Sequence, residues 1–511
     1  MTAPATADGW LRLDPRMLVV TPVTEIVKYI PVLFGAVVVG STSGNHLWGL
    51  VPAAAIVAYG VLRWFTTTYR VGESHVELRS GVLQRRTLSV PRTRIRSVDV
   101  EADLLHRLLG LAVLVIGTGQ QAEKNEGFRL DALDARAVPP LRTALLAHTA
   151  APAAPATASG AAPAPAAEVR EIAHWRPAWV RYAPLSLTGL AVVAPIAGLG
   201  AQYGIIDVIS DSAPVRHLGD DSAAIALLVV AGVALTAVAL VSVAACLQYL
   251  ATWFGLRVVD NGTTLHLTHG LFTTRQITLD MARFRGATID EPLLLRLARA
   301  GQLEMIMTGE NPRQKLVPQA PRTAVARTLD ELLDTRRGPD AGGGPRGQRI
   351  SGATLGTVDL VPHGPVARKR RYTKAAWPAA GAYLAVLVAL LLGADPPPWI
   401  WSVPAAFTVI MAALAEDRYR GLGHRVLPGA DGPAWLVTRR GSLDRSRDCL
   451  EARGVVGWTV KQTFWQRRSG VATVVAATAA GKKAYPVIDL PLDQAWALIE
   501  ATTPGLPGRR D

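Results

Sequence analysis

The chain has 511 residues, of which half are hydrophobic and 18% are charged, and its formal net charge is +14. This length allows about three domains and excludes a small disulfide-stapled scaffold, and so apolar a composition excludes a single soluble globular protein. The two cysteines supply neither a disulfide framework nor a zinc-binding spacing. The excess of Lys and Arg fits either nucleic acid or the cytoplasmic flanks of membrane helices, and the positions of these residues decide between the two.

Long stretches without charged residues predict membrane spans, because about 20 apolar residues cross a bilayer. They lie at 29–62, 183–206, 222–256, 375–394 and 396–415, and the first is long enough for two spans around its polar break at 41–46. The sequence therefore predicts six transmembrane helices arranged as three hairpins.

Basic residues flank the hairpins at the ends opposite their tips, and the tips are nearly free of Lys and Arg. Because basic flanks are retained in the cytoplasm, both termini and all segments between the hairpins are predicted to be cytoplasmic. This placement of the charge argues against a nucleic-acid partner. Tryptophans near the predicted span ends are expected to act as interfacial anchors, namely Trp64, Trp175, Trp179, Trp253 and Trp377.

Each hairpin is followed by a polar segment, and the three segments share one plan. Apolar and polar residues alternate on both sides of a single glycine, Gly81, Gly270 or Gly441, which indicates two antiparallel strands and a tight turn. A helical turn, another strand and a final amphipathic stretch follow. Such a repeat predicts small, partly open barrels or sandwiches, each capped by a helix.

Three arginines, Arg107, Arg296 and Arg467, recur at corresponding places in the three segments. We expect them to be structural, because the planar guanidinium can tie loop carbonyls together.

The predicted domain boundaries follow from the spans, the repeats and two linkers rich in Ala and Pro or in Gly, Pro and Arg. They are an N-terminal segment with hairpin 1 (1–65), module 1 (66–149), a linker (150–175), hairpin 2 (176–253), module 2 (254–335), a linker (336–374), hairpin 3 (375–416) and a divergent module 3 (417–504).

Two spans followed by Ser80-Gly81-Val82-Leu83, Arg85-Arg86, Pro91 and Arg94-Ile95 resemble the bacterial PH-like domain of YdbT-type membrane-flanking proteins. The similarity is good across 63–120, fair across 256–310 and poor across 424–490. The resemblance implies integral membrane α-helical hairpins with cytoplasmic α+β modules, each a PH-like, partly open β-barrel closed by a C-terminal helix. The resemblance does not imply an enzymatic activity. It associates the chain with resistance to secreted antimicrobial compounds.

The densest basic set follows the first hairpin and consists of Arg85, Arg86, Arg92, Arg94 and Arg96. Anionic lipid headgroups would favour such a set by about 1 kcal/mol per basic residue near the surface, so these arginines are candidate lipid contacts. The alternative is a solvated strand face or a topology determinant. The basic run at 368–371, just before the fifth span, is interpreted as a topology determinant.

Catalytic, metal-binding and cofactor-binding motifs were not found, so we expect no catalytic residue, no metal and no cofactor. The predicted function is a non-enzymatic protein of the bacterial cytoplasmic membrane, an interaction scaffold in envelope stress or antimicrobial tolerance with an unknown protein partner. A component of a transport or export machine is the main alternative, and an enzyme with an unrecognised interfacial site is a third. Polar side chains inside the helical bundle would favour transport, whereas exposed barrel edges would favour partner binding by strand addition.

Overall fold

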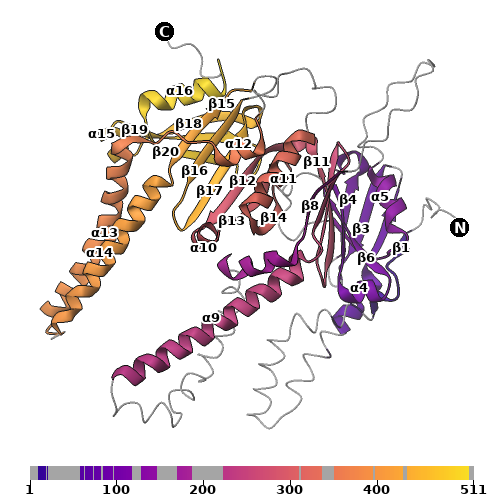
Figure 1. Cartoon of the computed structure of the whole chain (residues 1–511). Helices are drawn as coiled ribbons and strands as arrows, with labels where there is room; N and C mark the ends of the chain where they lie inside the picture. The colour runs from indigo at the N-terminus through magenta and orange to yellow at the C-terminus, as the bar shows by residue number, and fades with distance from the viewer. Residues whose placement is uncertain are drawn as a thin grey trace. The chain divides into compact units, whose positions relative to one another are not determined.

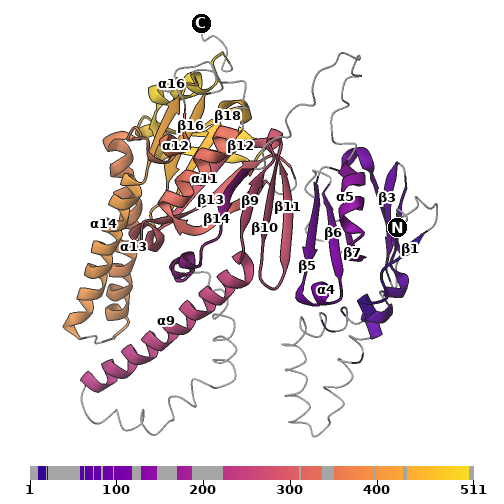
Figure 2. The same ribbon diagram turned by 45° about the vertical axis from the view of Figure 1, so that its right-hand side comes forward.

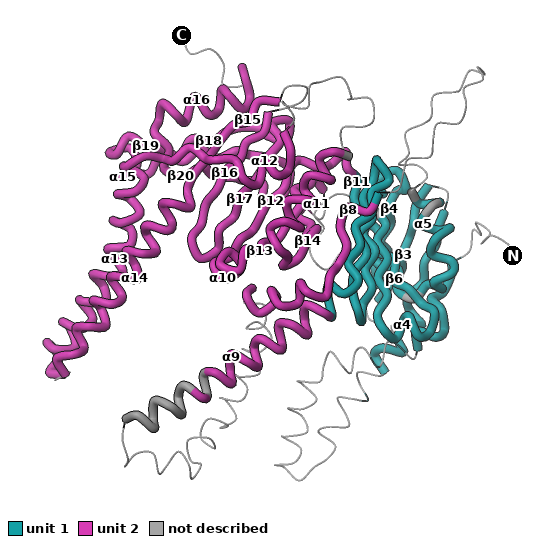
Figure 3. Tube along the Cα trace, viewed as in Figure 1, with its two compact units in different colours: residues 1–170, 251–280 teal, residues 171–250, 281–511 magenta. Residues whose placement is uncertain are grey.

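The computed structural model describes residues 10–18, 64–117, 128–146, 170–186, 223–309, 312–335, 350–394, 397–429 and 434–505, except 73, 82–84 and 96, together with residues 20, 23, 54 and 58–62. The chain divides into two compact units, which are described separately (Figure 3). The first unit comprises residues 1–170 and 251–280, and the second comprises residues 171–250 and 281–511.

The first unit contains module 1 and the first half of module 2. Its first sheet has the order β1-β2-β3-β4 and is antiparallel. Its strands and helices are β1 (Leu11–Arg12), β2 (Thr68–Val71), β3 (His75–Ser80), β4 (Arg86–Pro91), η1 (Arg92–Arg94), β5 (Ser97–Ala102), α4 (Leu104–Leu108), β6 (Leu111–Gly117), β7 (Phe128–Asp134), α5 (Val138–Leu146), β9 (Arg257–Asp260), β10 (Thr264–His269) and β11 (Thr274–Asp280).

Alternating apolar side chains of these strands form the core of module 1. Val76, Leu114 and Leu130 are fully buried, and Leu145 of α5 joins them from the closing helix. Burial of one face of each strand against this helix is what the period of two in the sequence predicts.

The second unit contains the second half of module 2 and all of module 3 (Figures 1 and 2). Its elements up to the last membrane helix are β8 (Arg170–His174, whose first residue belongs to the first unit), η2 (Pro177–Ser186), α9 (Ala223–Trp253, whose last turn belongs to the first unit), η4 (Met281–Arg283), β12 (Phe284–Pro292), α10 (Leu293–Leu297), β13 (Ala300–Met307), β14 (Arg313–Pro321), α11 (Arg322–Thr335), α12 (Gly352–Thr357), α13 (Gly364–Leu391), η6 (Pro398–Trp401) and α14 (Ser402–Arg420). Module 3 then adds β15 (Gly423–Leu427), β16 (Trp435–Arg440), β17 (Asp444–Glu451), η7 (Ala452–Gly454), β18 (Val455–Lys461), α15 (Phe464–Arg468), β19 (Val471–Thr478), β20 (Ala484–Pro491) and α16 (Leu492–Thr502).

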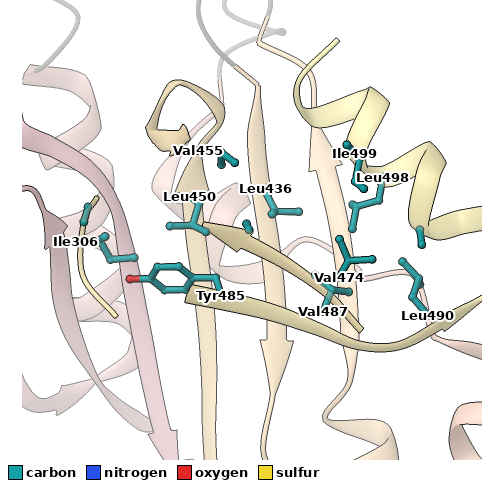
Figure 4. Packing of buried hydrophobic residues seen from close by; sticks show 13 residues of the cluster. Ile306, Leu436, Leu450, Val455, Val474, Tyr485, Val487, Leu490, Leu498 and Ile499 are labelled. Carbon is teal, nitrogen blue, oxygen red and sulfur yellow. The ribbon is translucent and has the colours of Figure 1, made fainter. Parts of the chain in front are cut away.

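The core of module 3 lies between the sheet β18-β19-β20, strands β16 and β17, and the closing helix α16 (Figure 4). Leu436, Val474 and Tyr485 are fully buried there, and Leu498 and Ile499 of α16 cover them. Module 3 thus keeps the plan of module 1 although its sequence similarity is poor.

The modules are not the separate barrels that the sequence predicts, and the sheets are not closed barrels. In the first unit the strand order β7-β6-β5-β11-β10-β9 joins the last strands of module 1 to the first strands of module 2. In the second unit the order β14-β13-β12-β17-β16-β15 joins modules 2 and 3 in the same way. A sequence pattern with a period of two does not state which strand lies beside which, so this pairing could not be read from it.

Three described helices, Leu235–Trp253, Gly364–Leu391 and Pro398–Arg420, are long and apolar enough to cross a membrane. Helices α13 and α14 lie side by side and form the third predicted hairpin (Figure 1). The other predicted spans fall largely outside the described residues.

Candidate site for an anionic ligand

A cavity of about 530 Å³ lies where helices α13 and α14 meet module 3. Four separate segments of the second unit form its wall: the start of α13, the end of α14, the β16–β17 turn and the loop before β20. Five basic side chains and one carboxylate are present. The lining residues are Arg371, Lys374, Arg418, Leu422, Arg440, Gly441, Asp444, Ser446, Lys482 and Ile488.

Asp489 fixes the start of α13 against module 3. This carboxylate is fully buried and accepts hydrogen bonds from Arg370 Nε at 3.0 Å and Arg371 Nη2 at 2.9 Å. Gln466 Nε2 of α15 donates a third bond at 2.8 Å. Because charge-assisted bonds to a desolvated carboxylate are strong and directional, they hold Arg371 in the cavity wall.

Asp417, near the end of α14, fixes the opposite wall. Its carboxylate accepts hydrogen bonds from Arg445 Nη2 at 2.9 Å, from Ser442 Oγ at 2.8 Å and from Arg296 Nη2 at 3.3 Å. These bonds join the turn between β16 and β17 to the helix end. Gly441 has a φ of 101° in that turn, where a Cβ would lie 1.9 Å from Asp444 O, so no other residue fits.

The electrostatics of the cavity favour an anion. Lys374 and Arg418 form no salt bridge with any described residue, and Arg440 meets Asp448 only at 3.8 Å. Behind the wall, burial and the neighbouring Arg447 and Arg445 lower the pKa of Arg439 to about 10. A concave site with more cations than carboxylates attracts phosphate or carboxylate groups.

The arginines predicted from the sequence lie elsewhere. Arg85, Arg86 and Arg94 are exposed, and Arg96 lies outside the described residues. Arg92 is half-buried and its Nη2 donates to the carbonyl of Ala144, which ties η1 to α5. The set therefore presents three exposed guanidiniums on a surface and one structural arginine, and a role in lipid contact stays a prediction.

The predicted tryptophan anchors occupy different environments. Trp377 is 79% exposed on α13, whereas Trp179 is buried. Trp64 donates from Nε1 to Asp14 O and Trp253 stacks on His269, and Trp175 is half-buried. Among these five predicted anchors, Trp377 alone is strongly exposed on a helix long enough to span, as an interfacial anchor is.

Sequence reasoning missed the cavity because its residues come from four distant segments, and it assigned the run 368–371 to topology alone. A signal was present: Lys374 precedes one span of the third hairpin and Arg418 follows the other. The start and end of an antiparallel helix pair meet at one level, so these cations had to come together.

Other chemistry-bearing side chains have structural surroundings. His266 Nδ1 lies 3.2 Å from Thr278 Oγ1 and His269 Nδ1 lies 2.7 Å from Thr252 O. Burial raises the pKa of the Cys449 thiol to about 12, which leaves it a poor nucleophile. Among the described residues, no three His, Cys, Asp or Glu side chains group as metal ligands.

The family model of the bacterial PH domain matches this chain three times, at residues 24–149, 213–335 and 375–502. Neither the curated proteins nor the solved structures gave a match. Each matched segment begins in or before a predicted hairpin and ends with a module's closing helix, and together the three cover most of the chain. The protein therefore belongs to the bacterial PH domain family and carries three PH-like units in tandem.

Proposed function

We propose that the protein is a non-enzymatic scaffold of the bacterial cytoplasmic membrane whose third PH module binds an anionic lipid headgroup in the cavity at the base of α13 and α14. The observation that carries this proposal is the concentration of five basic side chains around one cavity. Basic pockets beside membrane helices are suited to phosphate-bearing headgroups.

The position of the cavity along the helices supports a lipid rather than a soluble ligand. Leu387, Leu391 and Val409 are exposed on the long apolar helices, as lipid-facing side chains are. Lys374 lies one turn before Trp377, the exposed tryptophan that marks the expected membrane interface. The cavity would then lie at the depth of the headgroups.

The proposed orientation places the modules and both termini in the cytoplasm, because the basic residues gather at this end of the helices. A row of PH-like modules held beside the inner leaflet offers several surfaces to protein partners. We propose in addition that this scaffold acts in envelope stress or antimicrobial tolerance. This part of the proposal is based on the resemblance to YdbT-type proteins.

The test measures lipid retention by the full-length protein. The protein is purified in a mild detergent from bacterial membranes, and the anionic lipid that co-purifies is quantified by mass spectrometry. Replacing Lys374 and Arg418 together by Gln should reduce the retained anionic lipid about tenfold while leaving zwitterionic lipid unchanged.

The matched control replaces Lys369 and Arg420, exposed residues of the same two helices that do not line the cavity. Equal losses from both double variants would show a general charge effect and contradict the site. Inorganic phosphate that displaced the headgroup from the wild type would indicate a pocket for free phosphate instead.

A further inference from the structure

Two seams join neighbouring modules, and they have the same register. The first seam pairs β5 with β11 and the second pairs β12 with β17, both antiparallel. In each, the fifth residue after the turn glycine lies opposite the second residue before a helix N-cap: Arg275 faces Glu101, and Ser446 faces Asp290. We call β5 and β12 the acceptor strands, and β18 of module 3 is their counterpart.

An arginine completes each seam in the same way. Arg107 Nη1 donates to Leu271 O at 3.1 Å, and Arg296 Nη1 donates to Ser442 O at 3.4 Å. Both carbonyls belong to the residue that follows the turn glycine of the next module. Arg467 is the counterpart in module 3, where it is exposed and its guanidinium forms no hydrogen bond or ion pair with a described residue.

The backbone of module 3 also keeps the space that a docked strand needs. At Gly286 of the second seam a Cβ would lie 2.2 Å from Cys449 O of the docked strand. Gly457 holds the corresponding place next to the same bulge in β18, and no described atom lies within 4 Å of the position that a Cβ would take there. Among the described residues, no strand pairs with this edge of β18.

Exposed apolar side chains lie on β18 and on the helix that follows it. Val456 is 72% exposed, and Phe464 and Trp465 of helix α15 are 71% and 66% exposed. An apolar rim around an unpaired strand edge is typical of a surface that another chain covers.

The charge of this edge differs from that of the two filled seams. In the first filled seam the aligned position holds an ion pair, with Arg275 Nε 3.5 Å from Glu101 Oε1, and in the second seam Asp290 faces Ser446. Strand β18 has no carboxylate, and Lys461 stands where Glu101 and Asp290 stand. A basic residue opposite Lys461 would be destabilising, whereas a carboxylate there would restore the ion pair of the first seam with the two signs exchanged.

We propose that the edge of β18, with Arg467, docks the returning strand of a glycine-turn β-hairpin from another protein, with Asp or Glu five residues after the glycine. The free β3–β4 hairpin of a second copy has the right turn at Gly81 but carries Arg86 at that position, which opposes Lys461. The inference states which kind of partner the proposed scaffold binds. It rests on the proposed scaffold function but not on the lipid cavity.

The experiment uses full-length protein in zwitterionic detergent and a disulfide-closed peptide of residues 264–280 as the probe. With Arg275→Glu the peptide should bind the wild-type chain about tenfold more tightly than the unchanged peptide, measured by fluorescence anisotropy. On a Lys461→Glu chain the preference should reverse. Binding that is equal for both peptides, or that ignores residue 461, would overturn the proposal.

A second measurement separates docking from simple charge attraction. Arg467→Gln should weaken both peptides, whereas Arg468→Gln, at the exposed neighbouring position, should leave them unchanged. An equal loss of peptide affinity from the two changes would contradict the assignment of Arg467 to the docking edge.

The register predicts that Leu88 would lie opposite Thr459 if a second copy docked. Chains that carry only Leu88→Cys should not cross-link to chains that carry only Thr459→Cys. A dimer cross-linked at these two positions would overturn the assignment to another protein. Repeating these measurements on the chain with Lys374 and Arg418 replaced by Gln separates the docking edge from the lipid site, because neither residue belongs to β18 or α15.

Discussion

Arg371 donates a hydrogen bond of 2.9 Å to the fully buried carboxylate of Asp489, so the first turns of α13, a helix long and apolar enough to span a membrane, are fastened to the core of module 3. Arg370 binds the other oxygen of the same carboxylate. Two members of the basic run at 368–371 therefore have a structural role in addition to any effect on topology. The orientation of α13 and the fold of module 3 are coupled through this one residue.

Asp489→Asn should destabilise the second unit by about 3 kcal/mol, because removing one partner of a buried ion pair leaves the other charge uncompensated. Asn tolerates the φ of 59° at this position, so the change isolates the charge. Thermal unfolding followed by tryptophan fluorescence checks the loss. Asp493→Asn, an exposed change on α16, is the control, and equal unfolding temperatures for the two variants would contradict the prediction.

A buried histidine pair at the start of α13 should make the second unit sensitive to acid. His424 Nδ1 lies 3.1 Å from His363 Nε2, and His363 Nδ1 lies 2.7 Å from Ile488 O. Burial, then the neighbouring His363, lowers the pKa of His424 to about 4. Burial also lowers the pKa of His363, with Arg371 lowering it further and Asp489 opposing the shift.

The unfolded chain thus binds a proton at His424 between pH 6.5 and about 4 while the folded chain does not. Stability is complete above pH 6.5 and falls as the pH drops toward 4, by about 3 kcal/mol for this residue. Denaturant unfolding at several pH values measures the slope. His424→Gln should flatten it and His75→Gln should not, and a wild-type stability that does not change across this window would contradict the assignment.

The sequence predicts the hairpins, their glycine turns and the closing helices because these features are local. It does not predict the seams. The seventh residue after the turn glycine is Leu88, Ile277 or Asp448 in the three hairpins, and only tertiary contacts decide which of these strands is covered. Leu88 is exposed on β4, whose outer edge pairs with no described strand, whereas Asp448 is buried against Thr288. Edge pairing is a long-range property that a single strand does not encode.

The cavity escapes a sequence reading for a related reason. Its cations belong to four segments spread from Arg371 to Lys482, and each cation alone is typical of a helix flank or an exposed turn. Asp489 holds Arg371 in place, and Asp417, next to Arg418, joins the end of α14 to the β16–β17 hairpin that carries Arg440. Neither carboxylate is part of a recognisable motif.

Gly286 and Gly457 provide a matched pair for the second seam. Gly286→Ala should destabilise the second unit by about 1–3 kcal/mol, because its Cβ would overlap Cys449 O and force the strands apart. Gly457→Ala should change the unfolding temperature little, because its Cβ would meet open space. Thermal unfolding of the full chain compares them, and a large loss from the second change would mean that the edge of β18 is already covered.

The proposed orientation can be checked on the third hairpin, where both ends of a membrane helix are described. Lys369 lies at the basic end of α13 and Ala394 follows its apolar end, and both are exposed. Basic flanks are retained in the cytoplasm, so a cysteine at Ala394 should react with an impermeant thiol reagent in intact cells and one at Lys369 should react only after the membrane is opened. Cys449 is buried and Cys246 half-buried, so the unsubstituted chain gives the background. Labelling of the Lys369 variant in intact cells would reverse the orientation and move the cavity and the edge of β18 to the outer face of the membrane.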